Sequence, residues 1–194
     1  TTAIKGIPRN ANAMSDAPTS VLLVEDDPAD ASLIQQALAG TGDSLFHVEW
    51  VTCLSAALEL LGRKAIEVVL LDLTLPDVQG IEAFNQVLQA APNALILALS
   101  GSTDEEVARQ AVQHGAYDYL AKSHVDAHWL PRALHYVIER KAAKDALRNS
   151  EARFRAMSDA SPLGIFVTDV KGECAYTNAA YHKISGLTFE QTLG

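Results

Sequence analysis

The sequence predicts an α/β fold, with a doubly wound, five-stranded parallel sheet that carries helices on both faces. Five short apolar runs recur within the first 121 residues, and a segment with helical spacing follows each of them. Most of these runs are continuous rather than alternating, which is typical of parallel strands buried on both faces. Strands that alternate with helices in this way imply right-handed crossovers and a parallel sheet.

The predicted elements follow one another in a regular order. The strands are VLLV (21–24), FHVEWV (46–51), VVLL (68–71), ALILAL (94–99) and YDYLA (117–121). The helices lie within PADASLIQQALAG (28–40), LSAALELLGR (54–63), IEAFNQVLQAA (81–91), DEEVARQAVQHG (104–115) and a longer segment from about Asp126. The second strand alternates more than the others, so we place it at or near an edge of the sheet.

The composition is that of an ordinary globular protein, and it excludes several classes of function. Of 194 residues, 48% are hydrophobic and 20% are charged, with a formal net charge of −9. Phosphates repel an acidic chain, so we expect no nucleic-acid partner. No apolar run approaches the ~20 residues of a membrane span, so we expect no membrane partner. The two cysteines, Cys53 and Cys174, lack metal or redox spacing, which indicates a reducing, cytoplasmic location.

Polar side chains follow the carboxyl ends of four predicted strands. Glu25 and Asp26 follow the first, Asp72 the third, Ser100 the fourth and Lys122 the fifth. Each has a simple alternative explanation, because Asp72 could cap a helix, Ser100 could belong to a turn and Lys122 could be a solvated loop residue. Ligands of such sheets bind outside the carboxyl ends of the strands. Four such ends together therefore favour a functional site.

The residue types at these strand ends indicate phosphoryl transfer. Clustered carboxylates repel one another unless a cation lies among them. Oxygen ligands with open positions favour Mg²⁺, which binds one or two carboxylates together with phosphate oxygens. Asp72, at the centre of the cluster, can attack phosphorus as a nucleophile. The metal ion and Lys122 would then share the charge of the phosphoryl group, and Ser100 would hydrogen-bond one of its oxygens.

Residues 20 to about 140 resemble the receiver domain of bacterial two-component response regulators. The resemblance rests on the motifs VLLVEDDP, VVLLDLTLPDVQG, LALSGS and GAYDYLAKS, in this order. It implies a flavodoxin-like sheet with strand order 2-1-3-4-5. It also implies that a cognate histidine kinase or phosphotransfer protein donates the phosphoryl group.

The resemblance implies catalytic and switching roles for four residues. Asp72 matches the phosphoacceptor and Lys122 the phosphate-binding lysine. Ser100 and Tyr119 match the hydroxyl and aromatic switch pair. The family usually has a proline after the lysine, where this chain has Ser123. We therefore expect the loop into the last helix to differ from the common form.

The resemblance also implies a set of metal ligands. Asp26 and Asp72 would bind Mg²⁺ directly, together with the backbone carbonyl of Thr74, and Glu25 would act mainly through a coordinated water. Asp27, by contrast, stands before Pro28 and is predicted to cap the first helix rather than to bind metal.

The last helical pattern is longer than a receiver domain requires. It runs from about Asp126 to Met157, with Pro131 near its start. Its apolar positions recur at three- and four-residue spacing: Leu130, Leu134, Val137 and Ile138, then Tyr136, Ala143, Leu147, Ser150, Phe154 and Met157. The helix either packs along its own receiver or forms a parallel dimeric coiled coil. The extension favours the dimer, although alanine and serine weaken the seam.

The chain after this helix resembles the first half of a PAS sensor domain. GIFVTD and ECAYTN read as two strands of a hairpin joined by a VKG turn. NAAYHKISG reads as a short helix with a glycine stop, and Thr188 and Gln191 have capping-box spacing. A PAS fold needs further strands and a longer helix, so we expect a truncated, partial α+β fragment that buries little core.

These predictions combine into one domain order and one main function. We expect an expression leader (1–13), a receiver domain (14–140), a helical coiled-coil linker (141–157) and the N-terminal part of a PAS domain (158–194). The receiver would relay phosphorylation of Asp72 through its last helix to the PAS sensor and to an output module outside this sequence. The order of receiver, helix and PAS domain favours a diguanylate cyclase or phosphodiesterase as the output, and then a hybrid histidine kinase. Two alternatives stay open: a hydrolase of small phosphate esters that uses Asp72 as its nucleophile, and a pseudo-receiver used only as a dimer scaffold.

Overall fold

The computed structural model describes residues 18–39, 45–101 and 105–192, except for the side chains of 105–108 and 189. The predicted leader, residues 1–13, lies outside the described residues. Contacts between residues divide the chain into two units, which meet between Val137 and Ile138. We describe each unit by itself.

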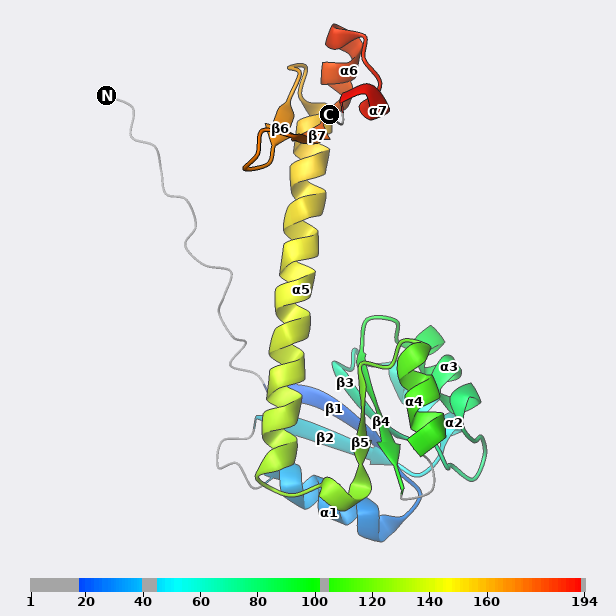
Figure 1. Cartoon of the computed structure of the whole chain (residues 1–194). Coiled ribbons are helices and arrows are strands. Elements are labelled where there is room, and N and C mark those ends of the chain that lie inside the picture. Colours follow the sequence, from blue (N-terminus) through cyan, green and yellow to red (C-terminus); the bar gives the residue numbers. More distant parts are fainter. Residues whose placement is uncertain (1–17, 40–44, 102–104, 193–194) are drawn as a thin grey trace, which may run out of the picture. The chain divides into compact units, whose positions relative to one another are not determined.

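The first unit is a five-stranded parallel sheet with helical crossovers (Figure 1). Its elements are β1 (Thr19–Val24), α1 (Pro28–Ala39), β2 (Phe46–Val51), α2 (Leu54–Leu61), β3 (Val68–Asp72), α3 (Ile81–Ala90), β4 (Leu95–Ser100), α4 (Glu105–Gln113), β5 (Asp118–Ala121), the 3₁₀ turn η1 (Lys122–His124) and the start of α5 (Trp129–Ala160). The strand order is β2-β1-β3-β4-β5. This confirms the predicted doubly wound order and the edge position of the second strand.

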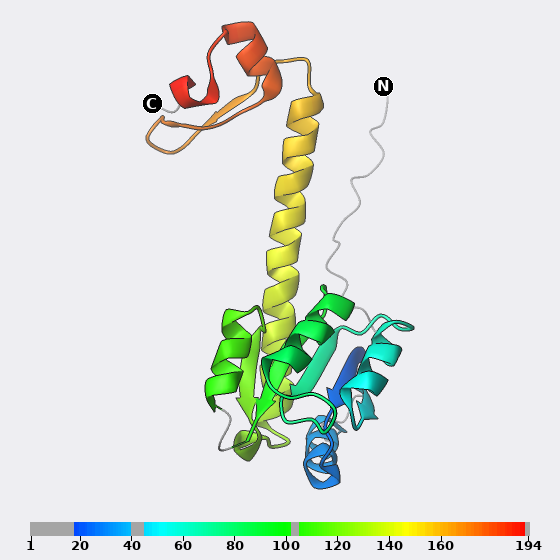
Figure 2. The same ribbon diagram turned by 90° about the vertical axis from the view of Figure 1, so that its right-hand side faces the viewer.

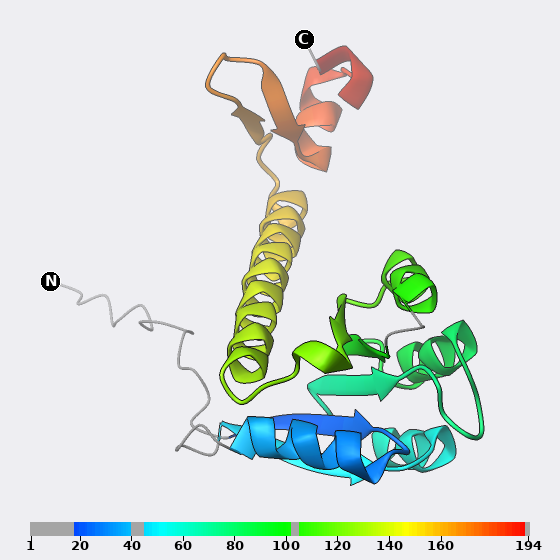
Figure 3. The ribbon, with the colours of Figure 1, turned by 60° about the horizontal axis from the view of Figure 1, so that its bottom comes forward.

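Helices cover both faces of the sheet, and apolar side chains are buried on each face. Helices α2, α3 and α4 lie side by side on one face, and α1 and the first turns of α5 cover the other (Figures 1 and 3). Every residue of β3 and β4 is buried, which explains their uninterrupted apolar sequences. Phe84 of α3 is fully buried, as are Leu130 and Leu134 of α5. Each buried side chain of this size stabilises the fold by ~1.5–3 kcal/mol.

The loop between β3 and α3 is held tightly at both ends. Leu73 and Leu75 are buried, and Thr74 forms a β-bridge with Gln79. The amide of Gly80 donates to the carbonyl of Leu73 at 2.6 Å. Gly80 has φ 66°, in the region that favours glycine, so this residue type is needed to close the loop.

Asp77, in the same loop, caps a different helix. Its carboxylate oxygens accept from the amides of Leu54 at 3.0 Å and Ser55 at 2.9 Å, the first two residues of α2. The N-cap residue of α2 is Cys53, whose side chain makes no cap hydrogen bond. Asp77 thus satisfies the free amides at this helix start from across the fold. These hydrogen bonds lower the pKa of Asp77; the one from Ser55 has the largest effect.

Helix α5 begins later than the sequence pattern predicts. The helix starts at Trp129 rather than near Asp126 and ends at Ala160 rather than near Met157. Asp126 lies outside the helix, where its Oδ1 accepts from the amides of His128 at 2.8 Å and Trp129 at 2.6 Å. A capping side chain of this kind ends the helical backbone on its N-terminal side. Pro131 is accommodated in the first turn, as predicted.

The second unit contains the rest of α5, the antiparallel hairpin β6 (Phe166–Thr168) and β7 (Cys174–Thr177), and the short helices α6 (Ala179–Ser185) and α7 (Phe189–Thr192) (Figure 2). The predicted hairpin is therefore confirmed. Gly186 ends α6 in the left-handed conformation, with φ 71°. Thr188 and Gln191 form the predicted capping box, since each side chain accepts from the amide of the other residue.

A buried asparagine joins the parts of the second unit. The Asn178 side chain donates to the carbonyls of Ser158 and Leu163 at 2.7 and 2.9 Å. Its oxygen accepts from the amides of Ile165 and Tyr181 at 2.8 and 3.0 Å. Both amide hydrogens and the oxygen are thus used, and the end of α5, the hairpin and the start of α6 are held together.

The second unit lacks an apolar interior in its described part. Its buried residues there are Ser158, Thr177 and Asn178, all of them polar. Leu163, Phe166 and Ile184 are each more than 60% exposed. This agrees with the expectation that a partial PAS fragment buries little core. Among the described helices, none combines the length and the apolar character needed to cross a bilayer.

We predict that the Asp77 cap makes a pH-dependent contribution to stability. Asp77→Ala should lower the free energy of unfolding at pH 7 by about 1 kcal/mol, the usual value of a helix cap. The folded pKa is lowered, so the stabilisation is present above the unfolded value of about 3.9 and is lost as the pH falls through the folded value.

Urea titrations of the wild type and Asp77→Ala between pH 7 and about pH 3 test this prediction, because the stabilisation is lost only below the unfolded pKa of about 3.9. The difference between the two proteins should shrink as the pH falls. Glu59→Gln is the control, because Glu59 is exposed on the same helix and forms a surface ion pair with Arg63. A difference that stays constant with pH would contradict a role for the charged carboxylate.

Candidate functional site

The parallel sheet brings the predicted polar residues to one edge. Glu25 directly follows β1, Asp72 ends β3, Ser100 ends β4 and Lys122 directly follows β5. Neighbouring strands are in register at these ends: Asp72 lies opposite Leu99, and Ser100 opposite Ala121. The carboxyl ends of parallel strands point the same way, so these side chains converge.

Asp72 is buried and held through both carboxylate oxygens. Its Oδ1 accepts from the amide of Thr74 at 2.9 Å and from the Thr74 hydroxyl at 2.7 Å. Its Oδ2 accepts from the Lys122 ammonium at 2.7 Å. Burial raises the pKa of this carboxyl, but the hydrogen bonds from Lys122 and Thr74 outweigh burial, so the pKa lies below its usual value. Asp72 is therefore ionised and fixed in orientation at neutral pH.

Lys122 lies among three carboxylates. Its ammonium nitrogen is 2.7 Å from Asp72 Oδ2, 2.7 Å from Glu25 Oε2 and 3.0 Å from Asp30 Oδ2. Burial alone would lower the pKa of Lys122, but the hydrogen bonds to these carboxylates raise it well above its usual range. The sequence reasoning did not identify Asp30, which lies in the first turn of α1.

Glu25 is the most deeply buried acid of the site. Its side chain is fully buried, and its Oε1 accepts from the amide of Asp27 at 3.2 Å. Burial, opposed by Lys122 and supported by the charge of Asp72, raises the pKa of Glu25 to about 7. The indole Nε1 of Trp50 donates to the backbone carbonyl of Glu25 at 2.7 Å. Trp50 is a second residue of this region that the sequence reasoning missed.

Three of the acids are placed so that they could share one cation. Carboxylate oxygens of Glu25, Asp26 and Asp72 lie within 4.8 Å of one another, with Asp26 exposed and the other two buried. Oxygen-only ligands beside open solvent fit Mg²⁺. Receiver domains bind Mg²⁺ through an acidic pocket of this kind.

Ser100 and Tyr119, the predicted switch pair, lie on the neighbouring strands β4 and β5. Ser100 is 1% exposed, and its hydroxyl has no hydrogen-bond partner in the part of the chain that the structure describes. A buried hydroxyl without a hydrogen-bond partner is costly in free energy. The Tyr119 side chain is 43% exposed. Tyr119 is paired with Ala98, two residues before Ser100.

Asp27 has the capping role that the sequence predicts. Its Oδ1 accepts from the amide of Ala29 at 2.7 Å, and Pro28 is the first residue of α1. This arrangement satisfies one of the free amides at the helix start. Asp27 therefore belongs to the helix cap rather than to the group of acids that could share a cation.

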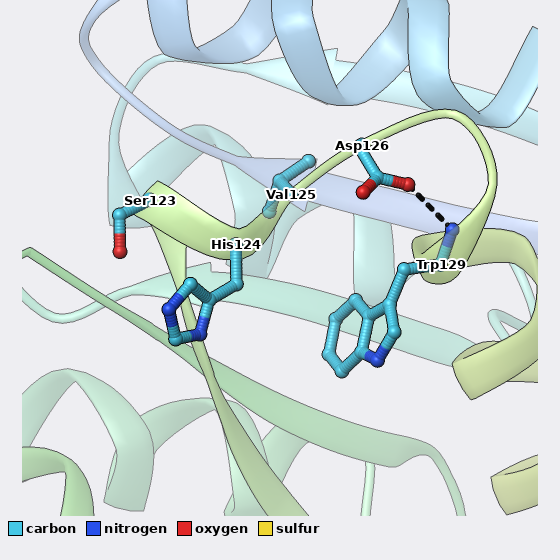
Figure 4. Close-up of a pocket in the computed structure, with 5 residues that line it drawn as sticks. All are labelled: Ser123, His124, Val125, Asp126 and Trp129. Atoms are coloured by element: carbon cyan, nitrogen blue, oxygen red, sulfur yellow. Dashed lines mark hydrogen bonds between the residues drawn. The ribbon is translucent and has the colours of Figure 1, made fainter.

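A hollow of about 390 Å³ lies in the loop that follows Lys122, outside the acidic site. Ser123, His124, Val125, Asp126 and Trp129 line it, as Figure 4 shows. Its side chains come from η1, from the segment between η1 and α5, and from Trp129, the first residue of α5. None of the acids that surround Lys122 takes part in its lining.

Comparisons with known proteins agree with this geometry. A sequence model of the response regulator receiver domain matches residues 21–135, and one of the PAS fold matches residues 152–194. A probable cyclic di-GMP phosphodiesterase of Vibrio cholerae is 28% identical over 67% of this chain and 29% of its own length. The KDP operon transcriptional regulatory protein KdpE of Escherichia coli is 38% identical over 54% of this chain and 44% of its own length.

A solved structure supports the fold. The CheY-like response regulator receiver domain protein from Methanospirillum hungatei has a TM-score of 0.58 and 21% identity, over 66% of this chain and 99% of that chain. The chain spans less than half of the length of the two curated relatives above. The receiver match covers more than half of the sequence and includes every strand end of the site. The chain belongs to the response regulator receiver domain family, and a PAS fold begins after its receiver.

Proposed function

We propose that this receiver accepts a phosphoryl group on Asp72 from a phosphohistidine of a cognate histidine kinase or phosphotransfer protein. The observation that carries the proposal is the convergence of Asp72 with Glu25, Asp26 and Lys122 around one edge of the sheet. Receiver domains take phosphoryl groups from histidine kinases. In the transfer, a carboxylate oxygen of Asp72 bonds to phosphorus while the bond from phosphorus to the donor nitrogen breaks.

Asp26, Asp72 and the Thr74 carbonyl would hold Mg²⁺, and Glu25 would hold one of its waters. The bound ion would offset the negative charge that gathers around phosphorus. Lys122 would face the phosphoryl oxygens, and the buried, unpartnered hydroxyl of Ser100 would donate to one of them. The phosphoryl group would add negative charge and strong acceptor oxygens at Asp72, which would draw Ser100 inward and let the exposed Tyr119 follow.

The signal would leave through α5 toward the PAS fold. The matches to the two curated relatives are about as long as a receiver domain, so they do not decide the output. The receiver, helix and PAS order favours a diguanylate cyclase or phosphodiesterase output, and then a hybrid histidine kinase. We place the protein in the cytoplasm, where its cysteines stay reduced.

The alternative function is hydrolysis of small phosphate esters through a transient phosphoryl group on Asp72. A hydrolase turns over free ester, whereas a receiver holds one phosphoryl group per chain. The tight enclosure of Asp72 by Thr74 and Lys122 supports the receiver.

We predict that Asp72 is the single phosphorylation site. Incubation with acetyl phosphate and Mg²⁺ should increase the intact mass by one phosphoryl group in the wild type and leave Asp72→Asn unchanged. Asp77→Asn, five residues further along the same loop, should react like the wild type. A full response in Asp72→Asn would place the nucleophile elsewhere, and steady release of phosphate from a small ester would favour the hydrolase.

We predict that Asp26→Asn weakens Mg²⁺ binding by about tenfold or more, because it removes a direct ligand. The fluorescence of Trp50 reports Mg²⁺ binding, since its indole donates a hydrogen bond to the backbone carbonyl of Glu25. A Trp129→Phe background leaves Trp50 as the single tryptophan for a fluorescence titration.

Asp27→Asn is the matched control for this titration. It removes the same charge from the adjacent position, and asparagine caps a helix as well as aspartate does. Its Mg²⁺ affinity should stay near that of the wild type. Equal affinities in the wild type and Asp26→Asn would contradict the proposed ligand set.

We also propose that α5 forms a parallel dimer. Between Ile138 and Ala160, Ser158 is the one described residue that its own chain buries. Tyr136, Leu147, Phe154 and Met157 are between 47% and 76% exposed. An apolar stripe of this kind on an otherwise polar helix favours a partner helix.

We predict that Leu147→Glu shifts the protein toward monomer, because it places a charge in the proposed seam. Arg148→Glu, at the next position around the helix, should dimerise like the wild type. Light scattering at several protein concentrations measures the mass of both variants and of a chain that is cut near Arg140. A wild-type mass that stays monomeric at high micromolar concentration would exclude α5 as the dimerisation element.

A further inference from the structure

Asp30 is an acid of the site that the proposed chemistry leaves without a role. It belongs to the first turn of α1, and its Oδ2 lies 3.0 Å from the Lys122 ammonium. The two residues are 92 positions apart in the sequence. The contact therefore depends on how α1 packs beside the end of β5.

Three carboxylates lie within ion-pair distance of the Lys122 ammonium. Lys122 donates hydrogen bonds to Asp72 Oδ2 at 2.7 Å and to Asp30 Oδ2 at 3.0 Å, and Glu25 Oε2 lies 2.7 Å away as an ion pair. An ammonium group has three donor hydrogens, so these contacts leave little room for a further acceptor. A phosphoryl oxygen on Asp72 therefore competes with these carboxylates for the ammonium.

Of the three contacts, the one with Asp30 costs the least free energy to break. The side chains of Glu25 and Asp72 are 0% and 3% exposed, whereas that of Asp30 is 38% exposed. A buried carboxylate that loses its cation pays a large desolvation cost, and a partly exposed one regains water instead. Glu25 Oε2 also has no hydrogen-bond partner besides its ion pair with Lys122, so releasing Glu25 would leave a buried oxygen alone.

We propose that Asp30 is a positioning residue that holds the Lys122 ammonium while Asp72 is unphosphorylated and releases it to a phosphoryl oxygen. This inference rests on the proposed phosphoryl transfer to Asp72. The ion pair between Asp30 and Lys122 then competes with the phosphoryl group for the same cation. Loss of the Asp30 carboxylate favours the phosphorylated state, even though Asp30 touches no reacting atom.

Beryllofluoride, bound with Mg²⁺, serves as the phosphoryl probe, and Trp50 fluorescence in the Trp129→Phe background measures its binding. Asp30→Asn should bind the probe about two- to fivefold more tightly, the range of a partly exposed ion pair. Asp30→Glu restores a carboxylate and should bring the affinity back toward wild type. Asp27→Asn removes the same charge from the cap of α1 without a contact to Lys122, so it controls for net charge.

A double-mutant cycle tests whether Asp30 acts through Lys122. The gain from Asp30→Asn should disappear in a Lys122→Gln background, because there is no ammonium left to release. A gain that persists there, or an affinity of Asp30→Asn that equals that of Asp27→Asn or is weaker than wild type, overturns the inference.

A second measurement works without beryllofluoride, in case Lys122→Gln no longer binds it. Acylation of lysines by a short pulse of acetic anhydride, read by peptide mass spectrometry, reports how firmly Lys122 is held. Asp30→Asn should raise the labelling rate of Lys122 about two- to fivefold relative to Lys64, which serves as an internal standard. An unchanged rate overturns the inference. If no variant responds to beryllofluoride while labelling changes as expected, the proposed phosphoryl transfer fails and the Asp30 contact stands.

Discussion

The ion contacts of Lys122 are the interaction on which this site depends. Glu25 and Asp72 are almost completely buried. Two buried carboxylates this close together would not both stay charged without a nearby cation. Lys122 supplies that cation from the end of β5 and reaches acids at the ends of β1 and β3 and in the first turn of α1. The same ammonium therefore stabilises the folded site and, in the proposed phosphoryl transfer, is the group that a phosphoryl oxygen would recruit.

The loop after β3 links this site to the stability of the fold. The nine residues from Asp72, at the end of β3, to Gly80 include the buried carboxylate that we propose as the nucleophile, the threonine that orients it and the aspartate that caps α2. The buried side chains of Leu73 and Leu75 anchor the loop in the core. Gly80 closes the loop in a backbone conformation that other residues rarely adopt. The same short segment therefore positions the site and contributes to the stability of the fold.

The two units are stabilised in different ways. The receiver has an apolar core that is built around fully buried strands, whereas the described part of the second unit is joined through the polar side chain of Asn178. Each hydrogen bond contributes about 1 kcal/mol to stability, and the burial of apolar side chains stabilises most folds more than hydrogen bonds do. Leu163 and Phe166 thus leave apolar surface exposed in the second unit.

The sequence by itself determined the features that follow from local pattern: the alternating strands and helices, the edge position of β2, the hairpin, the capping box at Thr188 and the Asp27 cap. It also placed Asp72, Ser100 and Lys122 at one edge, because all parallel strands end there. Periodicity placed the start of α5 too early, since Asp126 continues the helical pattern although it acts as a cap. Only the tertiary structure decided the contacts of Asp30 with Lys122, of Asp77 with α2 and of Trp50 with Glu25. The partners of these residues lie more than 20 positions away in the sequence. Such contacts form when separate elements pack together, so local residue spacing cannot predict them.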